Sequence, residues 1–202
     1  GVGALMHDVG KQDMAERYHH ADEHCSPSEA AAYRDHVARG VAHGRRMGSL
    51  IGTDITQGAG LIPYDVHAPE VDFTVTTSLK WMCGTPGAGI LYVTPRLTPH
   101  LHPELRGWFS QANPFSWALD AFAFAPDARR FDNGTPSTLS AIASLPALEW
   151  RMQQDDASFV AHNLALSTRL LEGLEAMGLT LATPREPERR GGSLMVSLPE
   201  ST

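Results

Sequence analysis

The chain has 202 residues, of which 42% are hydrophobic, 19% charged and 7% aromatic. This composition is typical of a globular protein and excludes a disordered chain. The net charge of −7 argues against a general nucleic-acid-binding surface. No apolar run is long enough to cross a membrane, and two cysteines suit a reducing compartment. We therefore expect a cytoplasmic protein with neither nucleic-acid nor membrane partners.

The first half of the chain combines a predicted helix with short predicted strands. The helix is expected to begin at Ser26, where SPSE at 26–29 supplies a cap, a first-turn proline and a capping-box glutamate, and to continue to about Met47. Three strands are then predicted over 49–54, 72–77 and 90–93. Their nearly continuous apolar or β-branched residues are typical of strands buried on both faces.

The second half is predicted to be irregular at first and then helical. Residues 94–134 are rich in proline and indicate loops. Helices are predicted from 135 to about 153 and from 155 or 156 to 177, followed by strands over 179–183 and 193–198. Leucines at helical spacing, with Met177, predict a core stripe on the second helix, and Trp81, Trp117 and Trp150 are expected to pack internally.

These elements predict an α/β architecture in three segments. Residues 1–45 form a helical piece, residues 46–150 an α/β domain, and residues 151–202 a linking helix with the start of a small α+β domain. Because the sequence starts without Met and stops inside an apparent strand, we expect it to be a piece of a longer protein.

Lysine is rare in this chain. Of 16 basic residues, only Lys11 and Lys80 are lysines. An amine can lose its proton and act as a nucleophile, whereas a guanidinium cannot. The rarity therefore marks Lys80 as a candidate reactive amine, unless an arginine-biased genome has left two lysines by chance.

Lys80 has a carboxylate and an amide as candidate neighbours. Asp54 closes one predicted strand, Gln57 follows it, and Lys80 follows the next strand. Ligands of open α/β sheets bind at the carboxyl ends of strands. A lysine that bonds an aldehyde, a carboxylate for a ring nitrogen and an amide for a phenolic oxygen are what pyridoxal phosphate needs. The simpler alternative is that Asp54 caps a turn and Lys80 is a surface amine.

The surrounding sequence resembles the class V aminotransferase family of fold-type I enzymes that use pyridoxal phosphate. The segments that carry this resemblance are DITQGAG at 54–60, TSLKWMCGTPGAGILYV at 77–93, GWF at 107–109 and RFDNGTP at 130–136. The family includes kynureninases, cysteine desulfurases and epimerase-like proteins. The resemblance covers about residues 45–200 and implies a partial large domain followed by the start of the small domain.

The resemblance also implies roles for individual residues. Lys80 would be the Schiff-base lysine and the catalytic residue, Asp54 the partner of the ring nitrogen, and Gln57 the neighbour of the phenolate. Ser78 or Thr77 would bind the cofactor phosphate within the same subunit.

The resemblance further implies a homodimer with a shared cofactor site and an amino-acid substrate, with kynureninase-like or aminotransferase-like chemistry. Trp108 and Thr135 would reach the phosphate held by the other subunit. Leu79 stands where many members carry His or Tyr, which leaves one contact to the cofactor without its usual residue. The phosphate loop and stacking aromatic of the family's first half have no counterpart upstream. Cys83 is expected to be a small buried hydrophobe.

A second resemblance concerns the N-terminal segment. HDVGK at 7–11 and SPSEAAAYRDHVARG at 26–40 resemble parts of the HD phosphohydrolases, including the HD-GYP cyclic-dinucleotide phosphodiesterases. The resemblance implies His7, Asp8 and His36 as ligands of a divalent metal, for which imidazole and carboxylate are suitable, and Lys11 as a phosphate contact. The alternatives to a pyridoxal phosphate enzyme are therefore a metal-dependent phosphohydrolase fragment and an inactive chimeric fragment.

Overall fold

The computed structural model describes residues 36–118 and 120–198. The chain divides into two compact units. One is the continuous segment Gly52–Asp156, and the other combines the segment up to Ile51 with the segment from Ala157 onward. The predicted helix start at Ser26 lies outside the described residues.

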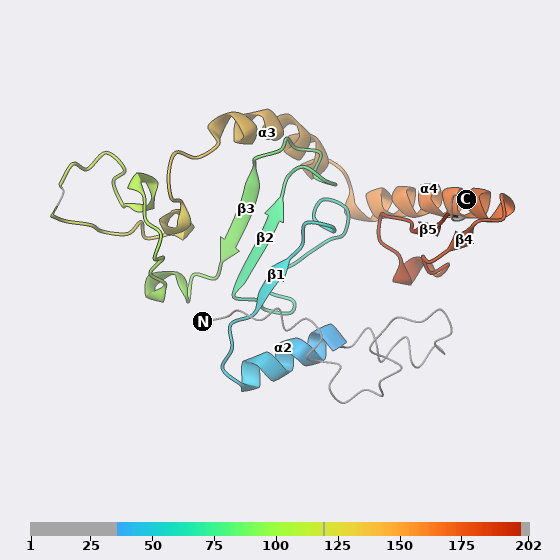
Figure 1. The fold of residues 1–202 in the computed structure, drawn as a ribbon, viewed down its shortest axis with the longest axis horizontal. Helices are drawn as coiled ribbons and strands as arrows, with labels where there is room; N and C mark the ends of the chain where they lie inside the picture. Colours follow the sequence, from blue (N-terminus) through green and yellow to red (C-terminus); the bar gives the residue numbers. More distant parts are fainter. Residues whose placement is uncertain (1–35, 119, 199–202) are drawn as a thin grey trace. The chain divides into compact units, whose positions relative to one another are not determined.

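A three-stranded sheet forms the centre of the continuous unit (Figure 1). Strands β1 (Gly52–Asp54) and β2 (Phe73–Thr77) are parallel, and β3 (Gly89–Val93) is antiparallel to β2. All three predicted strands are confirmed, although β1 begins later than expected. The preceding residues complete the end of a helix, since Ser49 donates its backbone N–H to the Gly44 carbonyl at 2.8 Å.

The sheet is not buried on both faces, and that prediction was wrong. Along β2, Thr74 and Thr76 are buried, whereas Phe73 and Val75 are 38% and 39% exposed. Successive side chains of a strand point to opposite faces, so the two hydroxyl side chains share the covered face. The apolar ones share a face that the described residues leave half open.

Helix α3 (Thr138–Met152) lies at the end of the sheet where β2 stops and β3 starts (Figure 1). It begins three residues after Thr135, close to the predicted start, and contains Pro146. The irregular segment before it holds three 3-10 helices, at Thr98–His100, Trp108–Ser110 and Ala128–Phe131. Between the last two, the chain extends away from the sheet as a long loop (Figure 1).

The second unit contains α2 (His36–Arg46) and α4 (Asp156–Ala176), followed by β4 (Thr180–Leu181), a 3-10 helix (Pro187–Arg189) and β5 (Val196–Ser197). The two strands pair antiparallel, which confirms the predicted C-terminal strands in shorter form. No helix among the described residues is long and apolar enough to cross a membrane.

Several residues expected in the core are exposed. Leu171 of α4 is buried, but Met177, just after the end of this helix, is 75% exposed, and Trp117 and Trp150 are 88% and 50% exposed. The prediction that these three pack internally was therefore wrong. Helical spacing identifies a face, but it does not say whether the described residues cover that face.

Candidate functional site

Asp54 and Lys80 lie at the same edge of the sheet. Asp54 is the last residue of β1 and pairs with Val75 of the parallel neighbour β2, which ends at Thr77. Lys80 follows three residues later, so both side chains belong to the carboxyl ends of adjacent strands. This is the edge at which open α/β sheets bind ligands. Both residues are exposed.

The Asp54 carboxylate is stabilised in its charged form. Hydrogen bonds from the Thr56 hydroxyl and backbone N–H lower the pKa of Asp54, and burial opposes this weakly. The positive charge of Lys80 lowers that pKa further. The backbone bond from Thr56 to Oδ1 of Asp54 measures 2.9 Å. Asp54 is therefore an anion at neutral pH, close enough to the Lys80 ammonium to interact with it.

The loop after β1 packs against the backbone that follows Lys80. Gly60 has a φ of 91°, and a Cβ there would lie 2.7 Å from the backbone of both Trp81 and Met82. Only glycine combines that conformation with so close an approach. Gln57 lies in the same loop and is exposed. The structure thus brings the segments of the predicted ring ligands together, and no hydrogen bond joins the side chain of Gln57 to Asp54 or Lys80 within the described residues.

Lys80 occupies a tight turn. Its carbonyl accepts the Cys83 N–H at 2.9 Å, and the Ser78 carbonyl accepts the Gly84 N–H at 2.7 Å. Cys83 adopts a left-handed φ of 55° and is exposed. The expectation that Cys83 is buried was wrong, because the turn directs it outward.

The two hydroxyls before Lys80 have different environments. Ser78 is 2% exposed, and its Oγ contacts the carbonyls of Thr85 and Ala88 at 3.0 and 3.1 Å. The Oγ1 of Thr77 is buried and has no hydrogen-bond partner within the described part of the chain. Ser78 is thus committed to internal contacts, whereas Thr77 retains a free hydroxyl.

Trp108 and Thr135 belong to two segments that pack closely and are joined by a hydrogen bond. A Cβ on Gly107 would lie 1.2 Å from the Asn133 carbonyl oxygen, and Ser110 donates its hydroxyl to the Asp132 carbonyl. Trp108 is 41% exposed, and Thr135 is exposed as well. For the described residues, no hydrogen bond links the side chain of Trp108 or Thr135 to Asp54 or Lys80.

The predicted metal ligands lie outside the part of the chain that the structure describes. They are His7, Asp8 and the side chain of His36, the first residue of α2. Over the described ranges, no group of three or more His, Cys, Asp or Glu side chains is arranged to hold a metal ion.

Ser144 is a residue of this region that the sequence did not indicate. It lies on α3, is 1% exposed, and its hydroxyl contacts the segment after Lys80. A serine within an apolar helical stretch carries no local signal, because its partner is 59 residues away in sequence.

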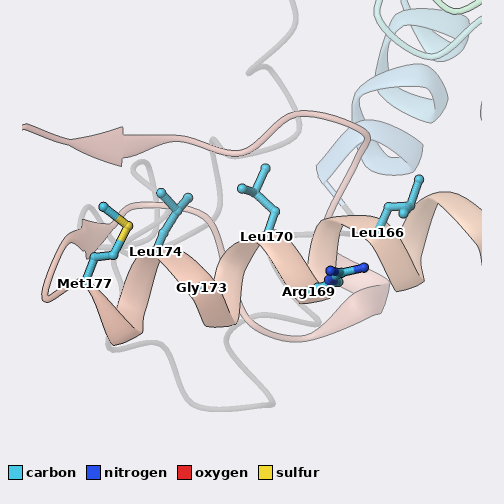
Figure 2. Close-up of a pocket in the computed structure, with 6 residues that line it drawn as sticks. All are labelled: Leu166, Arg169, Leu170, Gly173, Leu174 and Met177. Carbon is cyan, nitrogen blue, oxygen red and sulfur yellow. The ribbon is translucent and has the colours of Figure 1, made fainter.

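An open groove of about 420 Å³ runs along α4 (Figure 2). Its lining is mostly apolar and consists of Leu166, Arg169, Leu170, Gly173, Leu174 and Met177. The groove includes none of the predicted site residues and offers no carboxylate or hydroxyl toward a ligand.

Comparison with known proteins identifies the family. The class V aminotransferase family model matches residues 34–200. The chain belongs to this family. The family depends on pyridoxal phosphate, so the resemblance read from the sequence is confirmed. The match begins at residue 34 and includes His36, and nothing in the comparisons supports the HD phosphohydrolase alternative.

The curated relatives include several kinds of enzyme. The chain is 38% identical over 104 residues to the uncharacterized aminotransferase YcbU of Bacillus subtilis, covering 52% of this chain and 27% of that protein. It is 34% identical over 166 residues to the kynureninase of Deinococcus radiodurans, covering 80% of this chain and 40% of the relative. The chain therefore spans well under half the length of these relatives.

The fold also matches a solved structure. The apo cysteine desulfurase of Thermococcus onnurineus superposes with a TM-score of 0.70 at 21% identity, covering 81% of this chain and 40% of that one. This confirms the α/β fold of pyridoxal phosphate enzymes of fold type I, in partial form.

Proposed function

We propose that this chain carries the lysine side of a pyridoxal phosphate site in an enzyme that acts on an amino acid, with kynureninase-like or aminotransferase-like chemistry. The observation that carries the proposal is the shared strand edge of Asp54 and Lys80, together with their electrostatic interaction. The described residues suit such a cofactor. They offer an amine, a carboxylate held in its charged form, and, at Thr77, a buried hydroxyl without a partner.

In this proposal each residue would hold one part of the cofactor. Lys80 would supply the amine that bonds the cofactor's aldehyde group, Asp54 would keep the ring nitrogen protonated through its negative charge, and Gln57 would donate its amide N–H to the phenolic oxygen. Thr77 is favoured over Ser78 as the phosphate contact, because the Ser78 hydroxyl already serves two carbonyls. When bound, the cofactor accepts electrons from bonds to the substrate's α-carbon.

Lys80 would also move protons. Its amine, when it is not bonded to the cofactor, would act as a base that removes a proton from the substrate and returns it to another atom. A lysine serves this purpose because its amine can give up its charge, whereas an arginine at this position could not.

We also propose that the complete site is shared between two copies of the chain. Trp108 and Thr135 would contact the cofactor phosphate of the partner copy. The supporting observations are that both residues are exposed and that Gly107 and Ser110 hold their two segments together. The long loop around them exposes further aromatic side chains, with Phe115 at 68% and Trp117 at 88%.

Covalent trapping tests the lysine assignment. The protein is incubated with pyridoxal phosphate and reduced with borohydride, which adds hydride to the carbon–nitrogen double bond and fixes the label. Peptide mass spectrometry then locates it. We expect the label on Lys80, its loss in Lys80→Ala, and its retention in Lys11→Ala, the matched control because the chain has no third lysine. Equal labelling of both lysines, or none, would contradict the proposal.

A further inference from the structure

The turn that carries Lys80 is closed at its base by polar contacts. Ser78 and Gly84 face each other there, joined by the Gly84 N–H and the Ser78 carbonyl at 2.7 Å. The Ser78 hydroxyl, at 3.0 Å from the Thr85 carbonyl, ties the strand end to the segment that returns. The position of Lys80 therefore depends on how firmly these base residues are held.

Ser144 of α3 holds the returning segment from outside. Its Oγ accepts the Thr85 N–H at 2.9 Å and donates to the Ser140 carbonyl at 2.8 Å. The Thr85 hydroxyl donates to the same Ser140 carbonyl at 2.9 Å, and the Ser78 Oγ lies 3.4 Å from the Ser144 Oγ. Three hydroxyls and one amide thus meet at a single point of the helix, and Ser144 is 1% exposed.

Gly84 makes this close meeting sterically possible. A Cβ on Gly84 would lie 2.6 Å from the Ser78 Cβ and 2.8 Å from the Ser144 Oγ. Both distances are shorter than real Cβ atoms show, so a side chain at this position would separate the turn from the helix. Gly84 and Ser144 therefore form the contact between α3 and the turn of Lys80, which we call the joint.

The contacts of Ser144 exceed what a helical serine needs for itself. Such serines commonly bond a carbonyl one turn earlier in their own helix, as Ser167 of α4 does with the Leu164 carbonyl at 3.1 Å. Ser144 makes that kind of bond and in addition binds a backbone N–H from a segment distant in sequence. Its contacts with Thr85 and Ser78, and not the bond within α3, can affect Lys80.

We propose that Ser144 is a positioning residue that fixes the Lys80 turn at the sheet edge beside Asp54, so that the Lys80 amine meets the cofactor aldehyde in one orientation. The proposal rests on the proposed function, in which Lys80 carries the reactive amine. Ser144 does not touch the cofactor. It acts through Thr85, Gly84 and Ser78, and its removal loosens the turn while leaving the chemistry of the amine unchanged.

Hydrogen–deuterium exchange of the full chain without cofactor is the first measurement. In Ser144→Ala the Thr85 N–H loses its acceptor, and we expect exchange in the peptide covering residues 80–85 to become about tenfold faster. Ser167→Ala is the matched control, a buried helical serine whose bond stays within α4, and it should leave this peptide unchanged. Equal exchange in wild type and Ser144→Ala would overturn the proposal whether or not the chain binds a cofactor.

The second measurement is the circular dichroism of the cofactor's own absorption band, normalised to bound cofactor. A cofactor held in one orientation gives a strong induced signal, and we expect Ser144→Ala to lose about half of it while Ser167→Ala keeps it. An unchanged signal in Ser144→Ala would contradict a positioning role. Absence of Lys80 labelling in the wild type would instead refute the proposed function, and the exchange measurement would still decide the role of Ser144.

Two further variants cover the case in which Ser144→Ala does not fold. Ser144→Cys keeps a small side chain with a larger atom and a weaker acceptor, so its exchange rate and dichroism should fall between those of wild type and the loosened state. Gly84→Ala leaves Ser144 in place but forces the joint apart and should also speed exchange over residues 80–85. Wild-type exchange in both variants would overturn the proposal.

Discussion

Thr56 is the main cause of the lowered pKa of Asp54. The hydroxyl and N–H of Thr56 lower the pKa of Asp54, with the hydroxyl the larger cause. Thr56→Val removes the hydroxyl and keeps the N–H, so we predict that the pKa of Asp54 rises toward its ordinary value without reaching it. Carboxyl carbon NMR titration measures this directly, and an unchanged pKa would show that the backbone bond alone is sufficient.

The same shift determines how Asp54 affects stability at different pH values. Its pKa in the folded chain lies below the ordinary value of 3.8, so the folded state binds this proton less readily than the unfolded state. Its contribution to stability is therefore fully present above that value and is lost as the pH falls through the folded pKa. Thr56→Val should reduce this acid-dependent part of the unfolding free energy, with no change near neutral pH in the slope of stability against pH.

Removing the hydroxyl of Thr77 and removing that of Ser78 are predicted to change the unfolding free energy differently. Ser78→Ala removes the hydroxyl proton that the Thr85 and Ala88 carbonyls share and should cost about 1–3 kcal/mol of unfolding free energy. Thr77→Val replaces a buried hydroxyl, which has no partner among the described residues, by a methyl group and should be neutral or stabilising. Urea unfolding compares the two variants. A larger loss in Thr77→Val would mean that its hydroxyl has a structural partner.

The amine and the carboxylate were the parts of the site that the sequence predicted best. The rarity of lysine and the strand-end positions of Asp54 and Lys80 sufficed to predict the shared edge, because the carboxyl ends of parallel neighbours meet in any such sheet. The choice between Thr77 and Ser78 could not be made from sequence. It depends on which hydroxyl meets the carbonyls of the returning loop, a contact set by the fold of residues 84–88.

At the scale of elements, the join between the Trp108 and Thr135 segments depends on one glycine. Gly107 has extended backbone angles that any residue can adopt, so the cost of Gly107→Ala is steric, from a Cβ placed on the Asn133 carbonyl. We predict a loss of about 3 kcal/mol in unfolding free energy. Gly134→Ala, with nothing within 4 Å of its Cβ, is the control and should be nearly neutral in thermal unfolding. Equal effects of the two variants would indicate that the segments separate without cost.

The positions of helices and strands could be predicted from local sequence patterns, but which of their faces are buried could not. The patterns that predicted β2 and α3 are contained within each segment, and the structure places both close to their expected bounds. Burial depends on what covers an element, and for this reason β2 was wrongly expected to be buried on both faces. Ser144 could not be predicted for a similar reason. Its role depends on a hydrogen bond with Thr85, which is far away in sequence.

At the scale of the whole molecule, exposed apolar surface is the dominant feature of the described residues. Besides the open face of β2, Leu139, Ile142 and Met152 of α3 are 83%, 62% and 85% exposed. Exposed apolar side chains become sites of packing against another polypeptide where they form a contiguous patch. The chain matches 40% of the length of a kynureninase, and residues from elsewhere in such a protein would cover faces of this kind.

The proposed dimer makes a distinct prediction for the loop that extends from the sheet. If Phe115 and Trp117 lie in the interface, replacing either by Ser removes an aromatic contact worth about 2 kcal/mol, or roughly a 30-fold weaker dimer. Sedimentation equilibrium over a range of concentrations measures this. Leu139→Ser is the control, since Leu139 is as exposed at 83% but lies on α3. Equal weakening by all three variants would indicate nonspecific association through apolar surface, and no weakening by the aromatic variants would place the interface elsewhere.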